Sequence, residues 1–232
     1  MAEMLIWLTE NIGLKNEELR IREHTKDELS HYSSATFDIE FRYPFGSKTD
    51  DSSNITNQYE YKELCGIANR GNYDISQHAK FSKQNLLFFD TSTKEKLIPH
   101  VIEPSIGLER LFLAVLCSSY EFDKERDYVV LHLKNKLCPV ECAVLPLVNK
   151  FCVKAREIFE RLVDGNWRVS YDKGGSIGRR YARQDELGTK WCITIDGETE
   201  LDNTVTIRDR DSKEQKRVAI QQLLECSSLE SL

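Results

Sequence analysis

The segment EPSIGLERLFLAVL, residues 103–116, joins a polar stretch to an apolar one. Its first half contains Glu103 and a Pro-Ser step, and it ends at Gly107. From there apolar residues recur at the 3.6-residue period of a helix that faces a core; they are Leu108, Leu111, Phe112, Val115 and Leu116. We predict a buried helix that starts near Gly107. Ser105 is its expected cap, because a serine oxygen accepts a bond from an early backbone N–H.

Fixed charges stand at the start of this predicted helix. Glu109 and Arg110 fall in its first turn, and Glu103 lies just before it. A helix start has free backbone N–H groups and a partly positive charge, so an anion is favoured there. Two plainer interpretations stay open. Glu103 could be a surface carboxylate before a turn, and Arg110 could pair with Glu109 or Glu63.

Upstream of this segment the chain shows strand and turn patterns. Residues 38–46 (DIEFRYPFG) alternate apolar and charged side chains as a strand does, and 62–70 (KELCGIANR) form a second extended stretch. Between them, the Ser-, Asn- and Asp-rich residues 47–61 predict a polar surface loop. A short helix over 72–82 and two strands about a polar turn over 86–104 complete this half.

Downstream, helix and strand patterns alternate, which predicts a layered α/β domain. The predicted helices cover 147–162 and 175–188, and Gly188 ends the second. The predicted strands are 142–148, 167–172, 191–196, 204–211 and a last one that runs from residue 216 into a C-terminal helix.

The two halves also differ in charge. Within 118–128 an apolar helical pattern gives way to a charged stretch, so we divide the chain into domains 1–121 and 122–232. The first contains 13 Lys and Arg against 19 Asp and Glu, whereas the second contains 19 of each. The net charge of −6 over 232 residues makes no case for nucleic acid by itself, but it leaves room for a local basic face.

Composition excludes several other classes of protein. No apolar run is long enough to cross a membrane, and the acidic start MAEMLIWL lacks the features of a signal peptide. We therefore expect a cytoplasmic protein without a membrane partner. Seven cysteines without a CxxC pair predict buried, reduced thiols rather than a metal site.

The segment that contains Gly107 and Arg110 resembles motif 3 of class II aminoacyl-tRNA synthetases, in which a strand runs into a helix through Gly-Leu-x-Arg. Further motifs, in family order, resemble the glycyl-tRNA synthetases of the dimeric type. They are LRIREHTKDELSHYSSATFDIEF, PFG, KELCGIANRGNYDISQH, IPHVIEPSIGLERLFLAVL, AVLPLV, GSIGRRYARQDELGTKWCITID and TVTIRDRDSKEQKRV.

This resemblance implies an α/β protein in two parts. Residues 1–121 would be the C-terminal part of a catalytic domain, an α+β remnant with an antiparallel sheet. Residues 122–232 would be an anticodon-binding domain with a mixed five-stranded sheet. The segments that precede these parts in the family build its dimer interface and grip the ATP α-phosphate. We therefore expect a monomeric C-terminal fragment of a homodimeric enzyme, without glycine-dependent ATP–pyrophosphate exchange of its own.

The implied enzyme is a glycine–tRNA ligase, which joins glycine to tRNA(Gly) through glycyl-adenylate and uses ATP with Mg²⁺. The resemblance implies no acid, base or nucleophile, because such chemistry depends mostly on positioning and charge neutralisation. It assigns glycine to Glu103, Pro104, Ser105, Ile106 and Gly107, with Glu103 on the α-ammonium group. It assigns ATP to Glu63, Leu64, Gly107, Leu108, Glu109 and Arg110, with Glu63 near a phosphate-bound Mg²⁺.

The second domain of the family binds the anticodon stem, which makes four residues candidates for tRNA contact: Arg179, Arg180, Tyr181 and Arg183. An ordinary solvated helix face explains these arginines equally well. Leu64 could be simple core, and Trp167 and Trp191 are expected in the core rather than as stacking platforms. His24 and His31 are expected on an amphipathic helix without a ligand role.

Two features depart from the family. The stretch 47–61 looks like an insertion, and Cys65 stands where an acidic residue is common.

Two other classes of function compete with the ligase. One is a non-catalytic nucleic-acid-binding accessory protein, and the other is a regulatory module that senses uncharged tRNA. Retention of EPS, GLER and KEL favours the ligase. Prolyl-, threonyl- and histidyl-specific relatives rank lower, because their motif 3 regions read differently.

Overall fold

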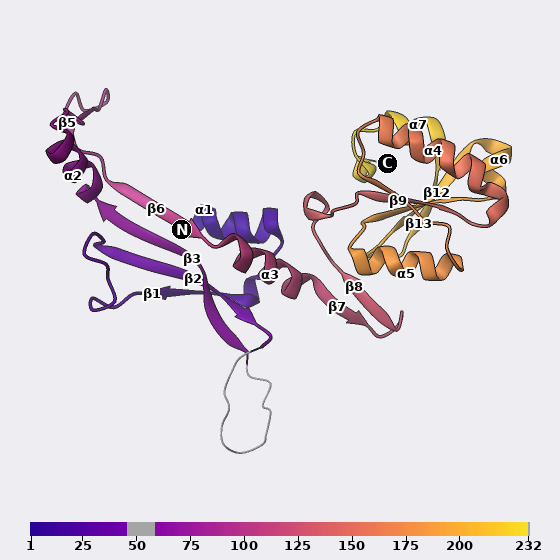
Figure 1. Ribbon diagram of the computed structural model, residues 1–232, viewed down its shortest axis with the longest axis horizontal. Helices are drawn as coiled ribbons and strands as arrows, with labels where there is room; N and C mark the ends of the chain where they lie inside the picture. The colour runs from indigo at the N-terminus through magenta and orange to yellow at the C-terminus, as the bar shows by residue number, and fades with distance from the viewer. Residues whose placement is uncertain (46–58, 232) are drawn as a thin grey trace, which may run out of the picture. The chain divides into compact units, whose positions relative to one another are not determined.

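A computed structural model describes residues 1–45 and 59–231 of the chain (Figure 1). The fold divides into two compact units, Met1–Ser118 (unit 1) and Ser119–Leu232 (unit 2). The predicted loop 47–61 lies outside the described residues except for its last three. Of these, Glu60 and Tyr61 already belong to a strand.

Unit 1 is built on a four-stranded antiparallel sheet with the order β1-β2-β3-β6. The strands are β1 (Leu19–Glu23), β2 (Ala35–Tyr43), β3 (Glu60–Gly71) and β6 (Val101–Ile106). The predicted strands 38–46 and 62–70 are thereby confirmed as β2 and β3. Both alternate side chains across the sheet, which is the period of two that the sequence shows.

Smaller elements follow β3 in unit 1. The predicted helix 72–82 is confirmed as α2 (Tyr73–Ser82). Strands β4 (Phe88–Phe89) and β5 (Lys96–Leu97) pair as a short hairpin before β6. The prediction of a helix that bears His24 and His31 was wrong. That segment turns between β1 and β2, because the His24 ring hydrogen-bonds to the Asp38 carboxylate at 2.7 Å.

The core of unit 1 lies on one face of its sheet. The N-terminal helix α1 (Ala2–Ile6) continues as a π-helical segment (Trp7–Ile12) that brings Leu8 into this core. A 3-10 turn (Asn16–Glu18) leads into β1. Buried members of the core are Leu8, Leu14, Ile39, Phe41, Tyr43, Leu64, Cys65, Ile67, Leu111 and Ala114.

Helix α3 (Leu108–Ser119) follows β6 as predicted, but only part of the expected stripe, Leu111 and Val115, packs in the core. Leu108 is 73% exposed and Phe112 is 65% exposed, whereas Leu111, Ala114 and Ser118 are buried. The buried positions follow the i, i+3, i+7 spacing of a single narrow helix face. The predicted Ser105 cap was also wrong. Ser105 pairs with Gly66 inside the sheet, and the Gly107 carbonyl accepts the first helical bond from the Leu111 N–H at 2.9 Å.

Unit 2 contains a mixed five-stranded sheet with the order β10-β9-β11-β12-β13. Its strands are β9 (Cys142–Pro146), β10 (Val169–Tyr171), β11 (Trp191–Ile195), β12 (Thr204–Asp209) and β13 (Gln215–Ala219). Strands β10 and β11 run parallel to β9, and β12 and β13 continue antiparallel. The predicted α/β class is therefore confirmed.

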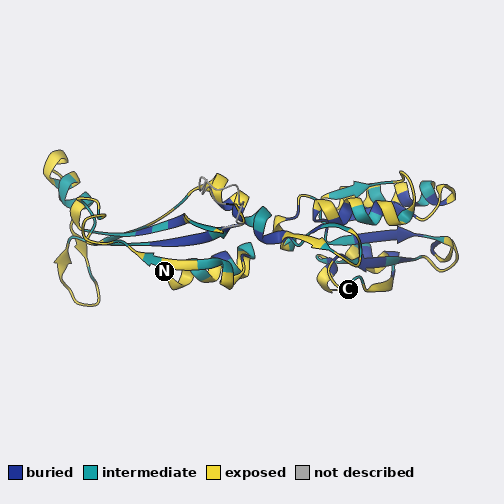
Figure 2. Cartoon of the chain, turned by 90° about the horizontal axis from the view of Figure 1, so that it is seen from below, coloured by how far each residue is buried: buried dark blue, intermediate teal, exposed yellow. Residues whose placement is uncertain are grey.

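Helices cover both faces of this sheet (Figure 1). Helix α4 (Cys152–Asp164) packs on the side of Val144 and Ile193, and α5 (Ile177–Leu187) packs on the side of Ala143 and Leu145. The buried strands appear as dark blue bands in Figure 2. Remaining elements are α6 (Gly197–Asp202), α7 (Ile220–Glu225) and the 3-10 turns Asn135–Leu137, Asn149–Phe151 and Leu229–Ser231.

The boundaries of unit 2 differ from the prediction at two places. The helix predicted from residue 147 starts only at Cys152, because the chain first makes a 3-10 turn. Residues Tyr120–Asp123 (β7) and Tyr128–Leu131 (β8) form a hairpin that the pattern did not predict. The end of α5 is confirmed, since Gly188 adopts the left-handed conformation with φ of 78°.

Candidate functional site

One face of the unit 1 sheet is polar. Strand register places Arg22, Asp38, Gly66 and Ser105 in one row across β1, β2, β3 and β6. Because side chains alternate between faces, every second residue along these strands shares that face. We call it the polar sheet face; its charged members are Arg20, Arg22, Asp38, Glu40, Arg42, Glu63, Arg70 and Glu103.

A β-bulge brings Glu63 onto the polar sheet face. Ile39 pairs with Cys65 and Glu40 pairs with Glu63, so Leu64 is an extra residue in β3. A Cβ atom at Gly66 would lie 3.4 Å from Glu63 Oε1 and 3.6 Å from Asp38 Oδ1. Two carboxylates therefore flank the bare backbone at this glycine. The Leu64 side chain is only 2% exposed, so it packs in the core and does not line a surface site.

Glu103 is held by an arginine that the sequence analysis did not single out. Arg70 Nη1 donates to Glu103 Oε2 at 2.7 Å, while its Nε and Nη2 bind Asp74. Hydrogen bonds that Arg70 donates to Asp74 and Glu103 raise the pKa of Arg70, and the bonds to Asp74 lower the pKa of that carboxyl. The guanidinium also lies 4.0 Å from the centre of the Tyr32 ring. Glu103 is thus oriented, yet its side chain stays 44% exposed.

Arg110 lies against the other end of β3. Its Nη1 donates to the Glu63 carbonyl at 2.9 Å and is 3.7 Å from Glu63 Oε2, which supports the interpretation that the two residues pair. The buried Tyr43 hydroxyl donates to the Arg110 carbonyl at 3.1 Å and so fixes the start of α3. Burial raises the pKa of Tyr43, although Arg110 acts in the opposite direction.

The five predicted glycine-binding residues do not share one face. Glu103 and Ser105 belong to the polar sheet face, whereas Pro104 and Ile106 alternate to the apolar side. There they line a hollow with Met4, Trp7 and Ile102. A Cβ at Gly107 would lie 3.7 Å from the Arg110 side chain, so glycine leaves room for that arginine. The predicted ATP residues Leu108 and Glu109 are exposed and point away from the core.

A second cluster on this face was also missed from sequence. Asp38 is only 5% exposed, and its Oδ2 lies 3.6 Å from Arg22 Nη1 in addition to its bond with His24. Arg22 also binds Glu28. The Thr25 backbone N–H and Arg22 lower the pKa of Glu28 to about 2. Only the pairing of β1 with β2 brings these residues together, so a single local motif could not reveal them.

The four predicted tRNA residues lie on α5 but differ in role. Arg180 is buried, and the Tyr181 hydroxyl bonds to the Thr194 hydroxyl at 2.6 Å, so both contribute to the packing of unit 2. Arg183 is half-exposed and binds Asp172 through Nε and Nη2 at 2.8 and 2.6 Å. Arg179 is exposed and makes no ion pair with the described residues. The helix is therefore not a plain solvated face.

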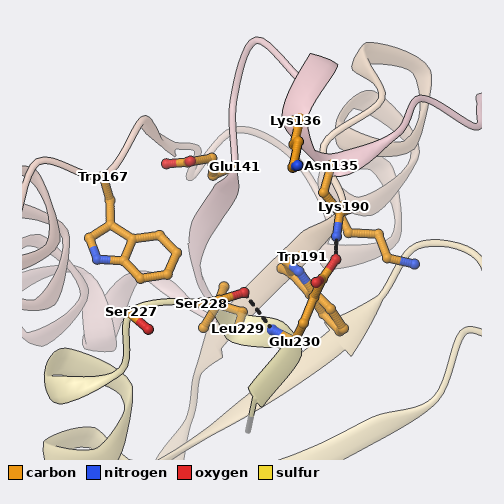
Figure 3. A pocket seen from close by; sticks show the side chains of 10 residues that line it. All are labelled: Asn135, Lys136, Glu141, Trp167, Lys190, Trp191, Ser227, Ser228, Leu229 and Glu230. Carbon is orange, nitrogen blue, oxygen red and sulfur yellow. Dashed lines mark hydrogen bonds between the residues drawn. The ribbon is translucent and has the colours of Figure 1, made fainter. Parts of the chain in front are cut away.

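A pocket of unit 2 lies near the amino ends of β9 and β11 (Figure 3). Trp167 and Trp191 line it with Glu141 and Leu229. Both tryptophans also pack against the core, as expected from sequence. The remaining lining residues are Asn135, Lys136, Lys190, Ser227, Ser228 and Glu230. The Asn135 amide donates to the Glu230 carboxylate, and the Lys190 ammonium group forms ion pairs with Asp209 and Asp211.

Unit 2 also contains a fully buried ionic cluster. Asp185 on α5 is 0% exposed and accepts two bonds from Arg208 at 2.9 and 3.0 Å. Arg126 donates to the same carboxylate at 2.8 Å, and the Tyr128 hydroxyl does so at 2.9 Å. Burial is the main cause that raises the pKa of Tyr128 to about 12, and the hydrogen bond to Asp185 adds to it. These contacts join the β7–β8 hairpin to α5 and β12.

Within residues 1–45 and 59–231, no three His, Cys, Asp or Glu side chains are placed to hold a metal ion. The same described residues contain no helix that is long and apolar enough to span a membrane. All seven cysteines are free thiols, and burial raises the pKa of Cys65 and Cys138.

The comparisons with known proteins first define a class. Residues 141–227 match the family described as "Anticodon binding domain". Unit 2 therefore contains an anticodon-binding domain of the class II aminoacyl-tRNA synthetase type, which agrees with its mixed five-stranded sheet.

Relatives that match nearly the whole chain are named glycine–tRNA ligases. The chain is 47% identical over 216 residues to the glycine–tRNA ligase of Mycoplasmopsis synoviae, across 92% of this chain and 45% of the relative. Identity with the glycine–tRNA ligases of Alkaliphilus metalliredigens and Geobacillus thermodenitrificans is 45% and 44%, across 94% of this chain and 44% of each relative. The chain is a homologue of the glycine–tRNA ligases, and it spans a little under half the length of these relatives.

Proposed function

We propose that this chain supplies the glycine-recognition face and the anticodon-binding domain of a glycine–tRNA ligase. In the reaction a glycine carboxylate oxygen attacks the ATP α-phosphorus, and pyrophosphate leaves. A ribose hydroxyl at the tRNA(Gly) 3′ end then attacks the carbonyl of glycyl-adenylate, and AMP leaves. The relatives support this activity, because the match to proteins named glycine–tRNA ligase extends over both units of this chain.

One observation carries the proposal: Glu103 and Glu63 share the polar sheet face, Arg70 hydrogen-bonds to the Glu103 carboxylate, and Arg110 lies within ion-pairing distance of the Glu63 carboxylate. Glu103 would bind the α-ammonium group of glycine in a charge-assisted contact, which is stronger than a neutral hydrogen bond. Arg70 keeps the Glu103 carboxylate in place before glycine arrives. Because the carboxylate does not have to reorganise, little ordering is needed when the substrate binds.

Nucleotide binding would fall at the other end of β3. Arg110 is a planar, permanent cation, suited to stack on adenine or to bind a phosphate. Glu103 pairs with Ala68, and Arg110 contacts Glu63. Five residues of β3 separate these points, or about 16 Å at roughly 3.3 Å per residue. An elongated ligand such as an aminoacyl-adenylate fits this arrangement better than a compact one.

The carboxylate of Glu63 also suits a divalent cation held mainly by ATP phosphates. Mg²⁺ is commonly bound through one or two carboxylates, substrate oxygens and water. Glu63 is 52% exposed and lies beside Asp38 at the bare backbone of Gly66, so it fits as one such ligand. The cation would neutralise charge on the phosphates. Glu63 would hold it near the reacting end of ATP.

The anticodon-binding domain would contact tRNA(Gly). The glycine–tRNA ligase to which this chain contributes would be a homodimer. Residues 1–121 would then contribute to the catalytic domain and 122–232 to tRNA binding. The structure divides the chain nearby, at Ser118 and Ser119.

Glycine-dependent ATP–pyrophosphate exchange tests the proposal. The chain would be joined to the part of the M. synoviae relative that it does not match. Glu103→Gln should lower glycine-dependent exchange by about 100-fold and raise the KM for glycine, because a neutral amide loses the charge-assisted contact. Glu17→Gln, at an exposed carboxylate of a 3-10 turn, is the matched control and should exchange normally. An unchanged KM for glycine in Glu103→Gln would remove Glu103 from the site.

A further inference from the structure

The loop before α5 has the features of an anion site. It runs through Lys173, Gly174, Gly175 and Ser176, between the end of β10 and the start of α5. It thus lies at the carboxyl end of a parallel strand, the edge where open α/β sheets place their ligands. A helix start there adds backbone N–H groups and a partial positive charge.

Hydrogen bonds within and around the loop fix its backbone conformation. Gly175 has φ of 74°, a conformation that favours glycine. Asp172 Oδ1 accepts the Gly174 N–H at 2.8 Å, and Arg183 Nη2 donates to the Gly174 carbonyl at 2.6 Å. Ser176 caps the helix by accepting the Arg179 N–H. No partner among the described residues is found for the Ile177 and Gly178 N–H groups, which remain free to bind a ligand.

A buried arginine beneath the loop is the independent observation. Arg180 is only 4% exposed; its Nη2 donates to the Gly175 carbonyl at 2.6 Å, and its Nη1 donates to the Pro146 carbonyl. Its Nε is buried without a hydrogen-bond partner. Arg208, by contrast, is neutralised by Asp185.

No carboxylate among the described residues lies within ion-pairing distance of Arg180. A buried charge without a counter-charge carries a large desolvation cost. The uncompensated cation lies directly under the loop whose amides are free. Lys173 and Arg179 are both exposed beside the same loop and add positive charge. Arg180 therefore lacks an anion that a ligand can supply.

We propose that this loop and the start of α5 bind one phosphate of the tRNA backbone. The Ile177 and Gly178 amides would donate to the phosphate oxygens, Arg180 would neutralise the charge from below, and Arg179 and Lys173 would do so from the solvent side. We name these five residues the α5 phosphate site. The inference rests on the proposed function and assigns a position for the nucleic acid on the anticodon-binding domain.

Gly178 offers a substitution that separates binding from folding. A Cβ there would meet no heavy atom within 4 Å. An aspartate in the first turn of a helix favours folding through the helix dipole, and replacing a helical glycine removes part of the entropic cost of folding. The same carboxylate would repel a phosphate. Gly178→Asp should therefore keep or raise the melting temperature while it weakens tRNA binding.

Binding of a tRNA(Gly) transcript by the full chain would be measured from low to moderate salt. Gly178→Asp should bind about tenfold more weakly, and its log–log salt slope should fall by about one charge. Gly178→Asn, of similar size but neutral, should lie close to the unsubstituted chain. Arg179→Gln should weaken binding a few-fold, whereas Arg161→Gln, at an exposed arginine in the last turn of α4, should not. Equal binding by Gly178→Asp and Gly178→Asn overturns the proposal.

A second measurement separates this proposal from the proposed function. Nuclear magnetic resonance of the Gly178 amide would be followed during titration with dimethyl phosphate and, separately, with inorganic phosphate. A shift with the phosphodiester supports the α5 phosphate site even if the chain selects no particular tRNA, which would count against the ligase alone. A shift with inorganic phosphate only, or with neither compound, overturns the site as a nucleic-acid contact.

Discussion

The two units use charged residues in opposite ways. In unit 1, Glu63 and Glu103 on the polar sheet face and Arg110 beside it keep 52, 44 and 59% of their side-chain surface exposed. In unit 2 the Asp185 side chain is 0% exposed and its partners Arg126 and Arg208 only 6 and 7%. Exposed pairs contribute little to stability, whereas a buried charge that loses its partner is costly. The second set therefore holds the fold, whereas the first set stays accessible to the ligand that we propose for it.

The largest effect should come from the buried cluster. Asp185→Asn leaves Arg208 without a counter-charge and leaves Arg126 with its Asp123 contact, so it should lower the free energy of unfolding of unit 2 by about 3–5 kcal/mol. Urea denaturation, followed by fluorescence of Trp167 and Trp191, measures it. Asp172→Asn, at the half-exposed pair with Arg183, is the control and should cost at most about 1 kcal/mol. Equal losses in the two variants would show that burial does not separate these pairs.

Acid should affect unit 2 next. Burial opposes ionisation of Asp211 and Asp209, but hydrogen bonds from Arg210 and Lys190 to Asp211, and from Lys190 to Asp209, outweigh it and lower both pKa values. A carboxyl with a lowered folded-state pKa stabilises the fold above its ordinary pKa of about 3.9, and this contribution is lost as the pH falls below that value.

Thermal melts between pH 6 and pH 2.5 would test whether unit 2 loses stability as the pH falls. The melting temperature of unit 2 should fall below about pH 4. Lys190→Met should lower it at pH 6 and flatten the fall at acid pH, because Lys190 helps to keep both carboxyls ionised. The same slope in Lys190→Met and the unsubstituted chain would exclude this pairing as the cause.

The smallest effect on stability should come from the polar sheet face. Arg70→Gln removes contacts to Asp74 and Glu103, which are 26 and 44% exposed, so the melting temperature of unit 1 should change by no more than about 2 °C. The KM for glycine in the joined protein should still rise, because Glu103 loses its support. A large fall in melting temperature with an unchanged KM would reassign Arg70 to the fold.

Local patterns explain which elements were predicted. The alternation in 38–46, the polar-to-apolar change at Gly107 and the glycine stop at Gly188 depend on neighbouring residues only. The first overlaps β2, and the other two coincide with observed helix boundaries. The buried stripe of α3 was predicted only in part, because several apolar stripes were available in LERLFLAVL and packing selected Ala114 beside Leu111 in place of Leu108 and Phe112. The β7–β8 hairpin depends on contacts with Asp185 and Arg210, far along the chain.

The candidate site was predicted in part. Glu103, Ser105 and Arg110 came from the resemblance of a contiguous motif, and the structure places the first two on the polar sheet face. Pro104 and Ile106 face the other side, since adjacent residues of a strand alternate. Arg70 and Asp38 reach the site through strand pairing. No spacing along the chain encodes that proximity.

The sequence by itself determined the class of the fold, the order of its elements and the resemblance to synthetases, because periodicity and contiguous motifs are properties of neighbouring residues. Only the tertiary structure decided which charges meet. The extra residue Leu64 turns Glu63 onto the same face as Gly66, and Arg180 is buried without a counter-charge among the described residues. Both facts arise from register and burial, which depend on residues far apart in the chain.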